Sequence, residues 1–269
     1  MLLENKQRRK LFATLIAAPL LLTITTANAQ TAEEKGLEIA REMDRRNEGF
    51  VDTTANMKMI LRNRAGKESL REMRSMVLEV KGDGDKSLTV FNQPKDVKGT
   101  ASLTFSHATT ADEQWLYLPA LKRVKRISSK NKSGPFMGSE FAFEDISSQE
   151  VDKYTYKFLR EEDLNGRATF VIESVPTYSN SGYTRLINWV DKEEYYPLKT
   201  EFYDRKNSLL KTLEQKRYQQ YLGKFWRASE MFMRNEQTGK STTLMWEDFK
   251  FQTGLSESDF NSKSLKRFR

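Results

Sequence analysis

The sequence contains no cysteine and only one histidine, His107, and it is poor in glycine and proline. Without cysteine the chain has no disulfide, thiolate metal site, iron–sulfur cluster or cysteine nucleophile. A single histidine also disfavours histidine-based metal sites and serine–histidine triads. The 13 glycines and 6 prolines are too few for a low-complexity chain, and a hydrophobic share of 38% is enough for a folded core. The composition favours a folded protein without catalytic activity, metal site or cofactor.

The N-terminal segment has the pattern of an export signal. Residues 1–10 carry four basic side chains against one acid, and an apolar stretch follows over residues 11–24. It leads to Ala27-Asn28-Ala29, a small-x-small pattern that signal peptidases cleave. A membrane anchor, the alternative, would need about 20 apolar residues to span a bilayer. We therefore expect a signal peptide over residues 1–29, cleaved after Ala29, and a single mature domain over residues 30–269 in a bacterial periplasm.

The hydrophobic pattern predicts one helix followed by many strands. Residues 31–47 read as a helix because Thr31 can cap its start, acids lie in the first turn and arginines lie towards the end. After Gly49 the apolar period changes from about 3.6 to about 2, which indicates strands with one solvated face. Segments of this kind, separated by turn residues, are found at 57–61, 76–80, 88–91, 114–118, 123–127, 154–160, 169–175, 183–190, 198–203, 209–218, 224–234 and 241–251.

These segments predict a mainly β protein with a few helices, of the α+β class. About eleven or twelve strands at hairpin spacing form one large antiparallel sheet. A sheet of that size curls because its strands twist. No composition break and no Pro/Gly-rich linker divides the chain, so we expect a single domain.

The side chains expected inside the curled sheet are large and deformable. Methionine is unbranched, and it recurs on surfaces that accept varied apolar partners. Spacing alone allows two interpretations, an ordinary core or a cavity with apolar walls for acyl chains. The candidates for this interior are Met57, Met59, Met73, Met76, Met231, Met233 and Met245, with Trp115, Trp189, Trp226 and Trp246.

A basic run lies in the middle of the chain. Between Glu113 and Glu140 there are six basic residues and no acid. The run is either a solvated strand face and loop or a contact for anionic lipid headgroups or an acidic partner. Nucleic acid is not expected as a partner, because the nearby aromatic residues form an apolar block and do not alternate with the basic ones. The residues predicted to make the headgroup or partner contact are Lys122, Arg123, Lys125 and Arg126.

Residues 133–146 differ in kind from the strands around them. Glycines flank Phe136-Met137, and Phe141 and Phe143 follow closely. Glycine-flanked apolar residues between strands are typical of a movable flap over a pocket. The same composition suits a static loop that plugs the mouth of a barrel, and the sequence does not separate the two. The acidic clusters at 144–145, 161–163 and 193–194 are expected on solvated surface, because neighbouring residues of a strand point to opposite faces.

Residues 114–146, QWLYLPALKRVKRISSKNKSGPFMGSEFAFEDI, resemble the hallmark segment of outer membrane lipoprotein-sorting (LolA-like) proteins. More narrowly, the segment resembles the branch often encoded beside exporters of the RND/MMPL type, and the likeness extends over essentially the whole mature chain. The resemblance implies a half-open, incomplete β-barrel with helices that act as a lid or plug over an apolar cavity. The positions that match the family pattern are Trp115, Tyr117, Pro119, Arg123, Arg126, Phe136, Gly138, Glu144 and Asp145.

The resemblance also implies a function and partners. Family members carry lipid or lipoprotein acyl chains through the periplasm towards the outer membrane, here with an RND/MMPL-type inner-membrane exporter and an outer-membrane acceptor as expected partners. We expect transient contact with the membrane surface and a monomer. The alternative is a lipid-sensing regulatory module of the same fold that binds a membrane-anchored signalling partner. The residues expected to form the acyl cavity and its flap are Met57, Met59, Trp115, Tyr117, Pro119, Phe136, Met137, Gly138, Phe141, Phe143, Trp189 and Trp246.

Overall fold

The structure is a computed structural model that describes residues 30–267. The predicted signal peptide over residues 1–29 therefore lies outside the described residues, as do residues 268–269. Within the described range, no helix combines the length and the apolar character that crossing a membrane requires.

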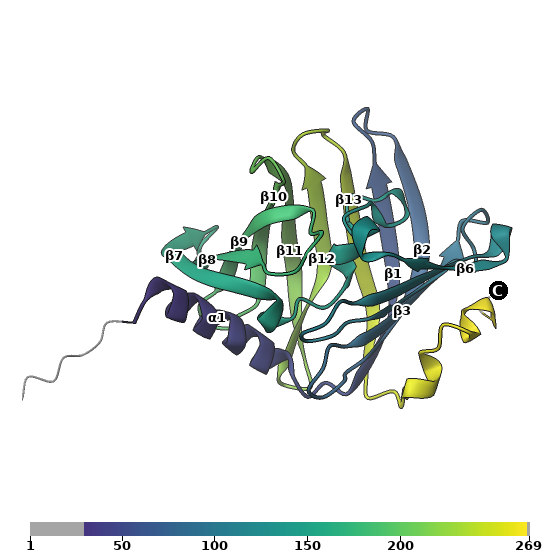
Figure 1. Cartoon of the computed structure of the whole chain (residues 1–269), viewed down its shortest axis with the longest axis horizontal. Helices are drawn as coiled ribbons and strands as arrows, with labels where there is room; N and C mark the ends of the chain where they lie inside the picture. Colours follow the sequence, from purple (N-terminus) through teal and green to yellow (C-terminus); the bar gives the residue numbers. More distant parts are fainter. Residues whose placement is uncertain (1–29, 268–269) are drawn as a thin grey trace, which may run out of the picture. The chain divides into compact units, whose positions relative to one another are not determined.

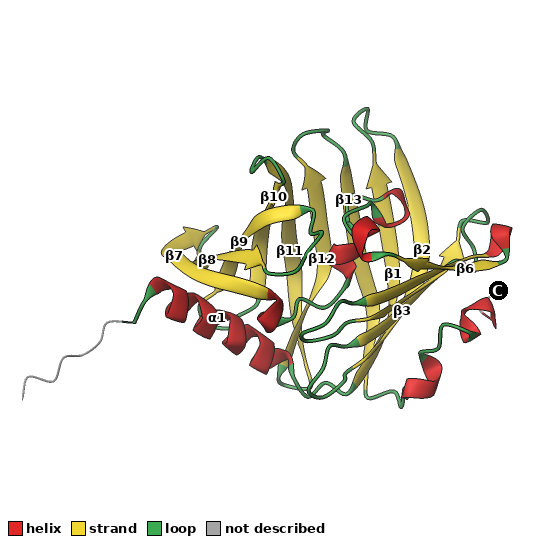
Figure 2. Ribbon diagram, in the orientation of Figure 1, coloured by secondary structure: helices red, strands yellow, loops and turns green. Residues whose placement is uncertain are grey.

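Thirteen strands form one antiparallel sheet (Figures 1 and 2). Pairing follows the chain order except in the middle of the sheet, where the first and the last strand are neighbours. The strands are β1 (Asp52–Arg62), β2 (Glu68–Leu78), β3 (Lys86–Gln93), β4 (Ala101–Phe105), β5 (Glu113–Leu118), β6 (Arg123–Ile127), β7 (Tyr154–Leu164), β8 (Arg167–Pro176), β9 (Tyr183–Asp191), β10 (Pro197–Asp204), β11 (Leu209–Tyr221), β12 (Phe225–Asn235) and β13 (Ser241–Phe251).

The sheet is curled but not closed, because its two edge strands, β6 and β7, do not pair with each other. The connection between β6 and β7 runs through residues 128–153 and lies inside the curve of the sheet (Figure 1). This is the predicted half-open barrel of a mainly β protein, and the fold prediction is confirmed. Two details differ: β4 has no predicted counterpart, and the segment predicted at 76–80 covers only the end of β2.

The expected lid helices are mostly single turns of 3-10 helix. Four of them lie in the connection between β6 and β7, and two follow β13 in the C-terminal segment. They are η1 (Pro119–Leu121), η2 (Ser129–Asn131), η3 (Phe136–Gly138), η4 (Phe143–Ile146), η5 (Val151–Lys153), η6 (Glu257–Asp259) and η7 (Ser264–Arg267).

The long helix, α1 (Ala32–Asn47), starts at a capping box in which the Thr31 hydroxyl accepts from the Glu34 amide and the Glu34 carboxylate accepts from the Thr31 amide. Gly36 faces β7 so closely that a Cβ there would lie 2.8 Å from the backbone of Lys157. Glycine is needed at this position because any side chain would separate the helix from the strand. Ile39 and Ala40 then pack against apolar residues of β7–β9, so α1 covers that end of the sheet.

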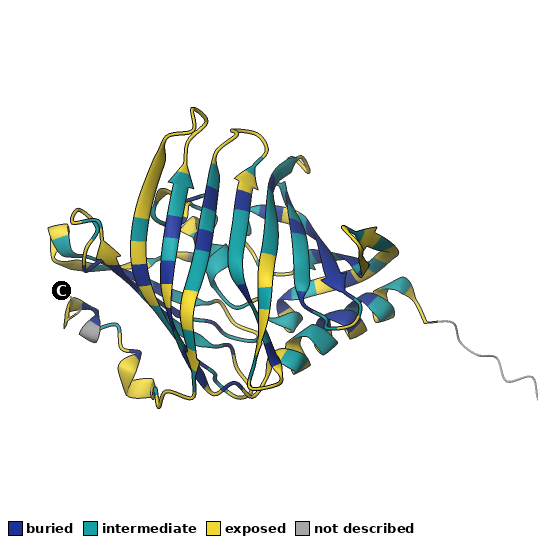
Figure 3. Ribbon diagram, turned by 180° about the vertical axis from the view of Figure 1, so that it is seen from behind, coloured by how far each residue is buried: buried dark blue, intermediate teal, exposed yellow. Residues whose placement is uncertain are grey.

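The two faces of the sheet carry separate apolar clusters. We call inner face the one that carries Met57, Met59 and Leu116, and outer face the opposite one. On the outer face of β3–β5, the side chains of Phe260 and Leu265 from the C-terminal segment are buried against Leu88, Val90, Leu103 and Tyr117. Along β1, for example, buried residues largely alternate with less buried ones, and Figure 3 shows buried and exposed stretches of the strands from behind.

Candidate functional site

The inner face presents an apolar wall of soft, large side chains. Met57 and Met59 of β1 lie opposite Met73 of β2 and Leu244 and Trp246 of β13. They share one buried cluster with Phe91, Leu116 and Met233. Of the methionines predicted for the interior, Met57, Met59, Met73 and Met233 are buried here and Met231 packs against them, whereas Met76 packs against the outer cluster.

The wall is covered by residues 133–146, which we call the plug. Phe136, Phe141 and Phe143 are exposed by only 4%, 3% and 9%, and all three belong to the same cluster as the wall. The Phe136 ring lies 6.1 Å from the Phe91 ring and 5.5 Å, edge to face, from the Phe143 ring. The aromatic side chains of this segment are therefore packed against the wall, an arrangement that both a movable flap and a static plug would show.

The plug has a defined backbone shape. The Phe136 amide donates to the Phe141 carbonyl over 2.7 Å, and the Phe143 amide donates to the Gly134 carbonyl over 3.1 Å. At the tip, Met137 and Gly138 both have positive φ angles, 51° and 76°, and glycine is favoured there because it has no Cβ. The Ser139 hydroxyl donates to the Phe136 carbonyl over 2.7 Å and closes the turn.

A buried ion pair holds the plug to the strands. The Lys211 ammonium of β11 lies 2.5 Å from the Asp145 carboxylate, and the two side chains are only 4% and 5% exposed. Lys211 also donates to the Glu140 carbonyl over 2.9 Å, and the Tyr183 hydroxyl donates to Asp145 over 2.7 Å. Each charge thus has several partners, which is what a dry environment requires.

Glu144, next to Asp145, is also engaged. Its carboxylate accepts from the Gly182 amide at 2.8 Å, from the Ser181 hydroxyl at 3.0 Å and from the Tyr178 hydroxyl at 3.3 Å. Burial raises the pKa of Glu144 above its usual range. The expectation that residues 144–145 are solvated is therefore wrong. Both acids lie in the turn η4, where neighbouring side chains need not point to opposite faces as they do in a strand.

Further contacts connect the plug with four other strands. The Gln114 amide donates to the Phe143 carbonyl over 2.8 Å, and the Arg71 guanidinium donates to the Met137 carbonyl. The Glu140 amide donates to the Thr242 hydroxyl over 3.0 Å, and the Glu140 carboxylate accepts from Asn235 over 2.7 Å. These partners come from β5, β2, β13 and β12, so the plug is attached across the whole width of the wall.

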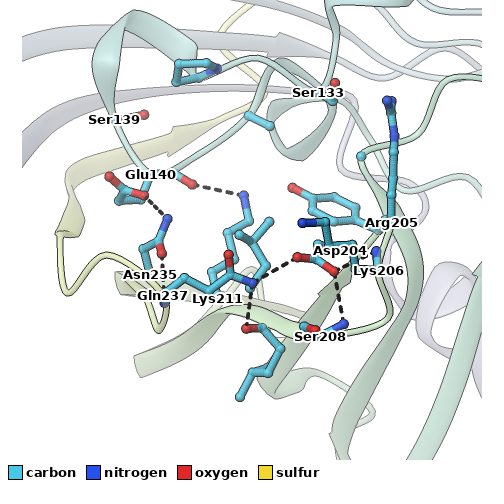
Figure 4. A pocket seen from close by; sticks show the side chains of 16 residues that line it. Ser133, Ser139, Glu140, Asp204, Arg205, Lys206, Ser208, Lys211, Asn235 and Gln237 are labelled. Atoms are coloured by element: carbon cyan, nitrogen blue, oxygen red, sulfur yellow. Dashed lines mark hydrogen bonds between the residues drawn. The ribbon is translucent and has the colours of Figure 1, made fainter.

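A pocket of about 750 Å³ opens beside the plug. Plug residues form one side, and the β9–β11 region together with the end of β12 forms the other (Figure 4). A second pocket, of about 250 Å³, lies between the plug tip and the ends of β1, β2 and β13. The residues that line the larger pocket are Ser133, Pro135, Ser139, Glu140, Ala142, Gly182, Tyr183, Asp204, Arg205, Lys206, Ser208, Leu209, Leu210, Lys211, Asn235 and Gln237.

The structure brings together seven of the twelve residues predicted to form the cavity and flap. Five are buried in the shared cluster and two pack against it; they are Met57, Met59, Phe136, Phe141 and Phe143, and Met137 and Trp246. The others lie apart: Trp115 and Tyr117 on the outer face beneath the C-terminal segment, Trp189 in a separate cluster, Pro119 in the turn η1, and Gly138 exposed at the plug tip.

Strand alternation explains this separation. Leu116 belongs to the inner cluster, so its neighbours Trp115 and Tyr117 must point to the other face. In β9, Leu186 belongs to the inner cluster, whereas Trp189 packs with Val171. The sequence is apolar at successive positions of these strands, and the size of the side chains does not indicate which of them lie on the inner face of the sheet.

The predicted basic contact residues lie on and beside the edge strand β6. Lys122, Arg123, Lys125 and Arg126 are all exposed. Arg126 is paired with Glu113 at 2.6 Å, and Lys122 has a left-handed φ of 49° in the turn before β6. Beside them, Leu121 is 63% exposed. The structure therefore displays a basic edge with an exposed leucine.

Sequence reasoning missed the polar residues that hold the plug. Lys211 lies on a strand that reads as half-solvated, Gln114 begins a strand that is apolar at successive positions, and Arg71 lies before the segment predicted at 76–80. No local pattern marks these residues as buried partners. Tyr183 was included only as the start of a strand. One signal was available in the sequence. Glu144 and Asp145 match the family pattern and directly follow Phe143, so if that phenylalanine is buried, the two carboxylates need hydrogen-bonding partners.

A family model described as "-like: Uncharacterized protein" matches residues 83–267. Comparison with curated proteins gives no match. Among solved structures, a LolA superfamily protein from Nitrosomonas europaea is 22% identical, with a TM-score of 0.68, and the match covers 87% of this chain and 98% of that one. At that identity the likeness concerns the fold alone, and it agrees with the open half-barrel.

Two further structures are closer in sequence. An outer membrane lipoprotein-sorting protein domain from Vibrio parahaemolyticus is 61% identical, with a TM-score of 0.86, over 87% of this chain and 100% of that chain. A DUF1329 family protein from Desulfovibrio piger is 30% identical, with a TM-score of 0.83, over 87% of this chain and 99% of that chain. The chain therefore belongs to the family of outer membrane lipoprotein-sorting domain (DUF1329) proteins with a LolA-like fold.

Proposed function

We propose that the protein is a periplasmic carrier that binds the acyl chains of a lipid or lipoprotein on its inner face and moves them towards the outer membrane. The observation that carries the proposal is the plug: three phenylalanine rings cover a methionine-lined wall, on a connecting segment that is held to the strands by hydrogen bonds and a buried ion pair. An acyl chain can replace those rings on the wall, because burial of each of its CH₂ groups contributes about 0.8 kcal/mol to the free energy of binding. In this proposal the plug and the acyl chain occupy the same wall in turn.

Partners belong to the same proposal. The family resemblance supports an RND/MMPL-type inner-membrane exporter as the source of cargo and an outer-membrane acceptor as its destination. A plug that returns to the wall after release keeps the methionines from water while the carrier is empty. The carrier function needs no catalytic step, and we propose none.

The first test is binding of a fluorescent fatty-acyl probe. Phe136→Ala and Phe141→Ala each remove a ring that competes with the acyl chain. Loss of a buried phenylalanine costs about 3–5 kcal/mol, so plug closure weakens. The probe should bind each variant at least about tenfold more tightly than it binds the parent chain.

The matched control is Phe260→Ala. This phenylalanine is also 4% exposed, but it packs on the outer face. Phe260→Ala should lower the free energy of unfolding and leave acyl affinity unchanged. If the parent chain and both plug variants fail to bind the probe, and no lipid is extracted from the purified protein, the carrier proposal is wrong.

We further propose that the basic edge at β6 makes the transient contact with anionic membranes. Its support is the exposure of Arg123 and Lys125, which project from a strand with no neighbour beyond it. Each basic residue near an anionic surface contributes about 1 kcal/mol. Arg123→Glu/Lys125→Glu should therefore weaken sedimentation with phosphatidylglycerol vesicles about tenfold or more. Reversal of Lys95 and Lys98, exposed on the β3–β4 turn, is the control, and equal weakening by both double variants would contradict the assignment.

A further inference from the structure

The larger pocket is lined by two cationic side chains, Arg205 and Lys206, that do not take part in the plug contacts. Arg205 and Lys206 come from the turn between β10 and β11 and lie at the pocket, with Lys211 beside them (Figure 4). Arg205 donates from Nε to the Ser181 carbonyl over 3.1 Å, which orients its guanidinium. Among residues 30–267, neither Arg205 nor Lys206 forms an ion pair with a carboxylate.

The acids of the same pocket are already engaged. Asp204 accepts from the backbone amides of Lys206 and Ser208 at 2.9 and 3.0 Å, and from the Gln237 side chain at 2.9 Å. Glu140 accepts from Asn235 at 2.7 Å. The carboxylates thus hold the turns of the pocket in place, whereas two cations remain available to a ligand.

The pocket reaches the contacts that hold the plug. Its lining includes Ala142, Tyr183 and Lys211, and all three donate hydrogen bonds to Asp145. Glu140, whose carbonyl accepts from Lys211, lines it as well. An anion bound in this pocket therefore lies next to an ammonium whose present partner is the plug carboxylate.

We propose that this pocket binds the anionic headgroup, a phosphate or a carboxylate, of an amphiphile whose acyl chain takes the place of the plug; the inference rests on the carrier function proposed above. Arg205 and Lys206 attract the headgroup. Lys211 exchanges the Asp145 carboxylate for the ligand anion. Because both anions compete for one ammonium, headgroup binding favours departure of the plug, and the two events are coupled.

The test compares amphiphiles that share a chain and differ in charge. Dodecyl phosphate, dodecanol and inorganic phosphate each compete with the fluorescent acyl probe on the full mature chain, below the concentrations at which they aggregate. Dodecyl phosphate should displace the probe at a concentration at least about tenfold lower than dodecanol does. In Arg205→Ala/Lys206→Ala this preference should fall below about threefold, with displacement by dodecanol unchanged. Lys95→Ala/Lys98→Ala, which removes two exposed cations elsewhere, should keep the preference.

Each other outcome overturns a defined statement. Equal displacement by dodecyl phosphate and dodecanol, or a preference that survives Arg205→Ala/Lys206→Ala, refutes the headgroup site and leaves the carrier function standing. Direct calorimetric binding of inorganic phosphate as tight as that of dodecyl phosphate makes the pocket a free-anion site, and also refutes the headgroup site. Failure of every amphiphile and of the probe to bind refutes the carrier function itself.

Discussion

Replacement of Lys211 by methionine is expected to loosen the plug by about 3–5 kcal/mol, because it leaves the Asp145 carboxylate buried without its counter-ion. The remaining donors to Asp145 are the Tyr183 hydroxyl and the Ala142 amide, and neither carries charge. Methionine has nearly the length of lysine and keeps the packing of its aliphatic chain, so the loss of plug stability measures the effect of removing the charge. Hydrogen exchange of the Phe136 and Phe143 amides measures it, since both donate within the plug.

The control is the double variant Asp145→Asn/Lys211→Met. It removes both charges and leaves an amide that can still accept from the Ala142 amide. Replacement of a whole buried ion pair is often nearly neutral, so most of the lost protection should return. A loss below about 1 kcal/mol in Lys211→Met would show that the pair contributes no more than an exposed salt bridge.

A plug fixed covalently to the wall is expected to abolish acyl binding. Glu140 and Thr242 are suitable positions, because the Glu140 amide and the Thr242 hydroxyl are 3.0 Å apart. The chain has no cysteine, so Glu140→Cys/Thr242→Cys can form one disulfide only. Oxidation keeps the phenylalanine rings on the wall, and affinity for the fluorescent acyl probe should fall by at least about a hundredfold.

The same double variant under reducing conditions is the internal control, together with the two single-cysteine variants. These proteins lose plug contacts of Glu140 and Thr242, so all of them should bind the probe at least as tightly as the parent chain does. Mass spectrometry establishes that the disulfide has formed. Undiminished binding by the oxidised protein would mean that acyl chains enter without departure of the plug, and the proposed exchange would then be wrong.

The elements that the sequence predicted best are those with a local period. The expected helix at 31–47 matches α1, because its cap, charges and apolar stripe all lie within the helix itself. Most strands were found for the same reason. Strand β4 was missed because it is short and buried on both faces: Ala101 to Phe105 alternate apolar residues with serine and threonine, and no charged residue marks a solvated face.

The candidate site was predicted only in its apolar half. Phe136, Phe141 and Phe143 were recognisable as unusual from composition alone. The polar half depends on partners far apart in the chain: Asp145 and Lys211 are separated by 66 positions. Each of the two occurs in a segment that looks solvated by itself, and only the curl of the sheet brings them together. The pocket cations Arg205 and Lys206 read as ordinary turn residues for the same reason.

The pairing of β1 with β13 has a consequence for how the protein folds. Met59 is in register with Leu244, so the centre of the sheet joins the two ends of the folded unit. Synthesis from the N-terminus supplies β1 early, yet that strand has only β2 beside it until the last strand exists. Pairing of two strands so far apart in the chain is slow, because the entropy cost of closing the loop between them arises before their contacts can stabilise it. The central β1–β13 pairing, and with it the complete sheet, therefore cannot form until the final strand has been made.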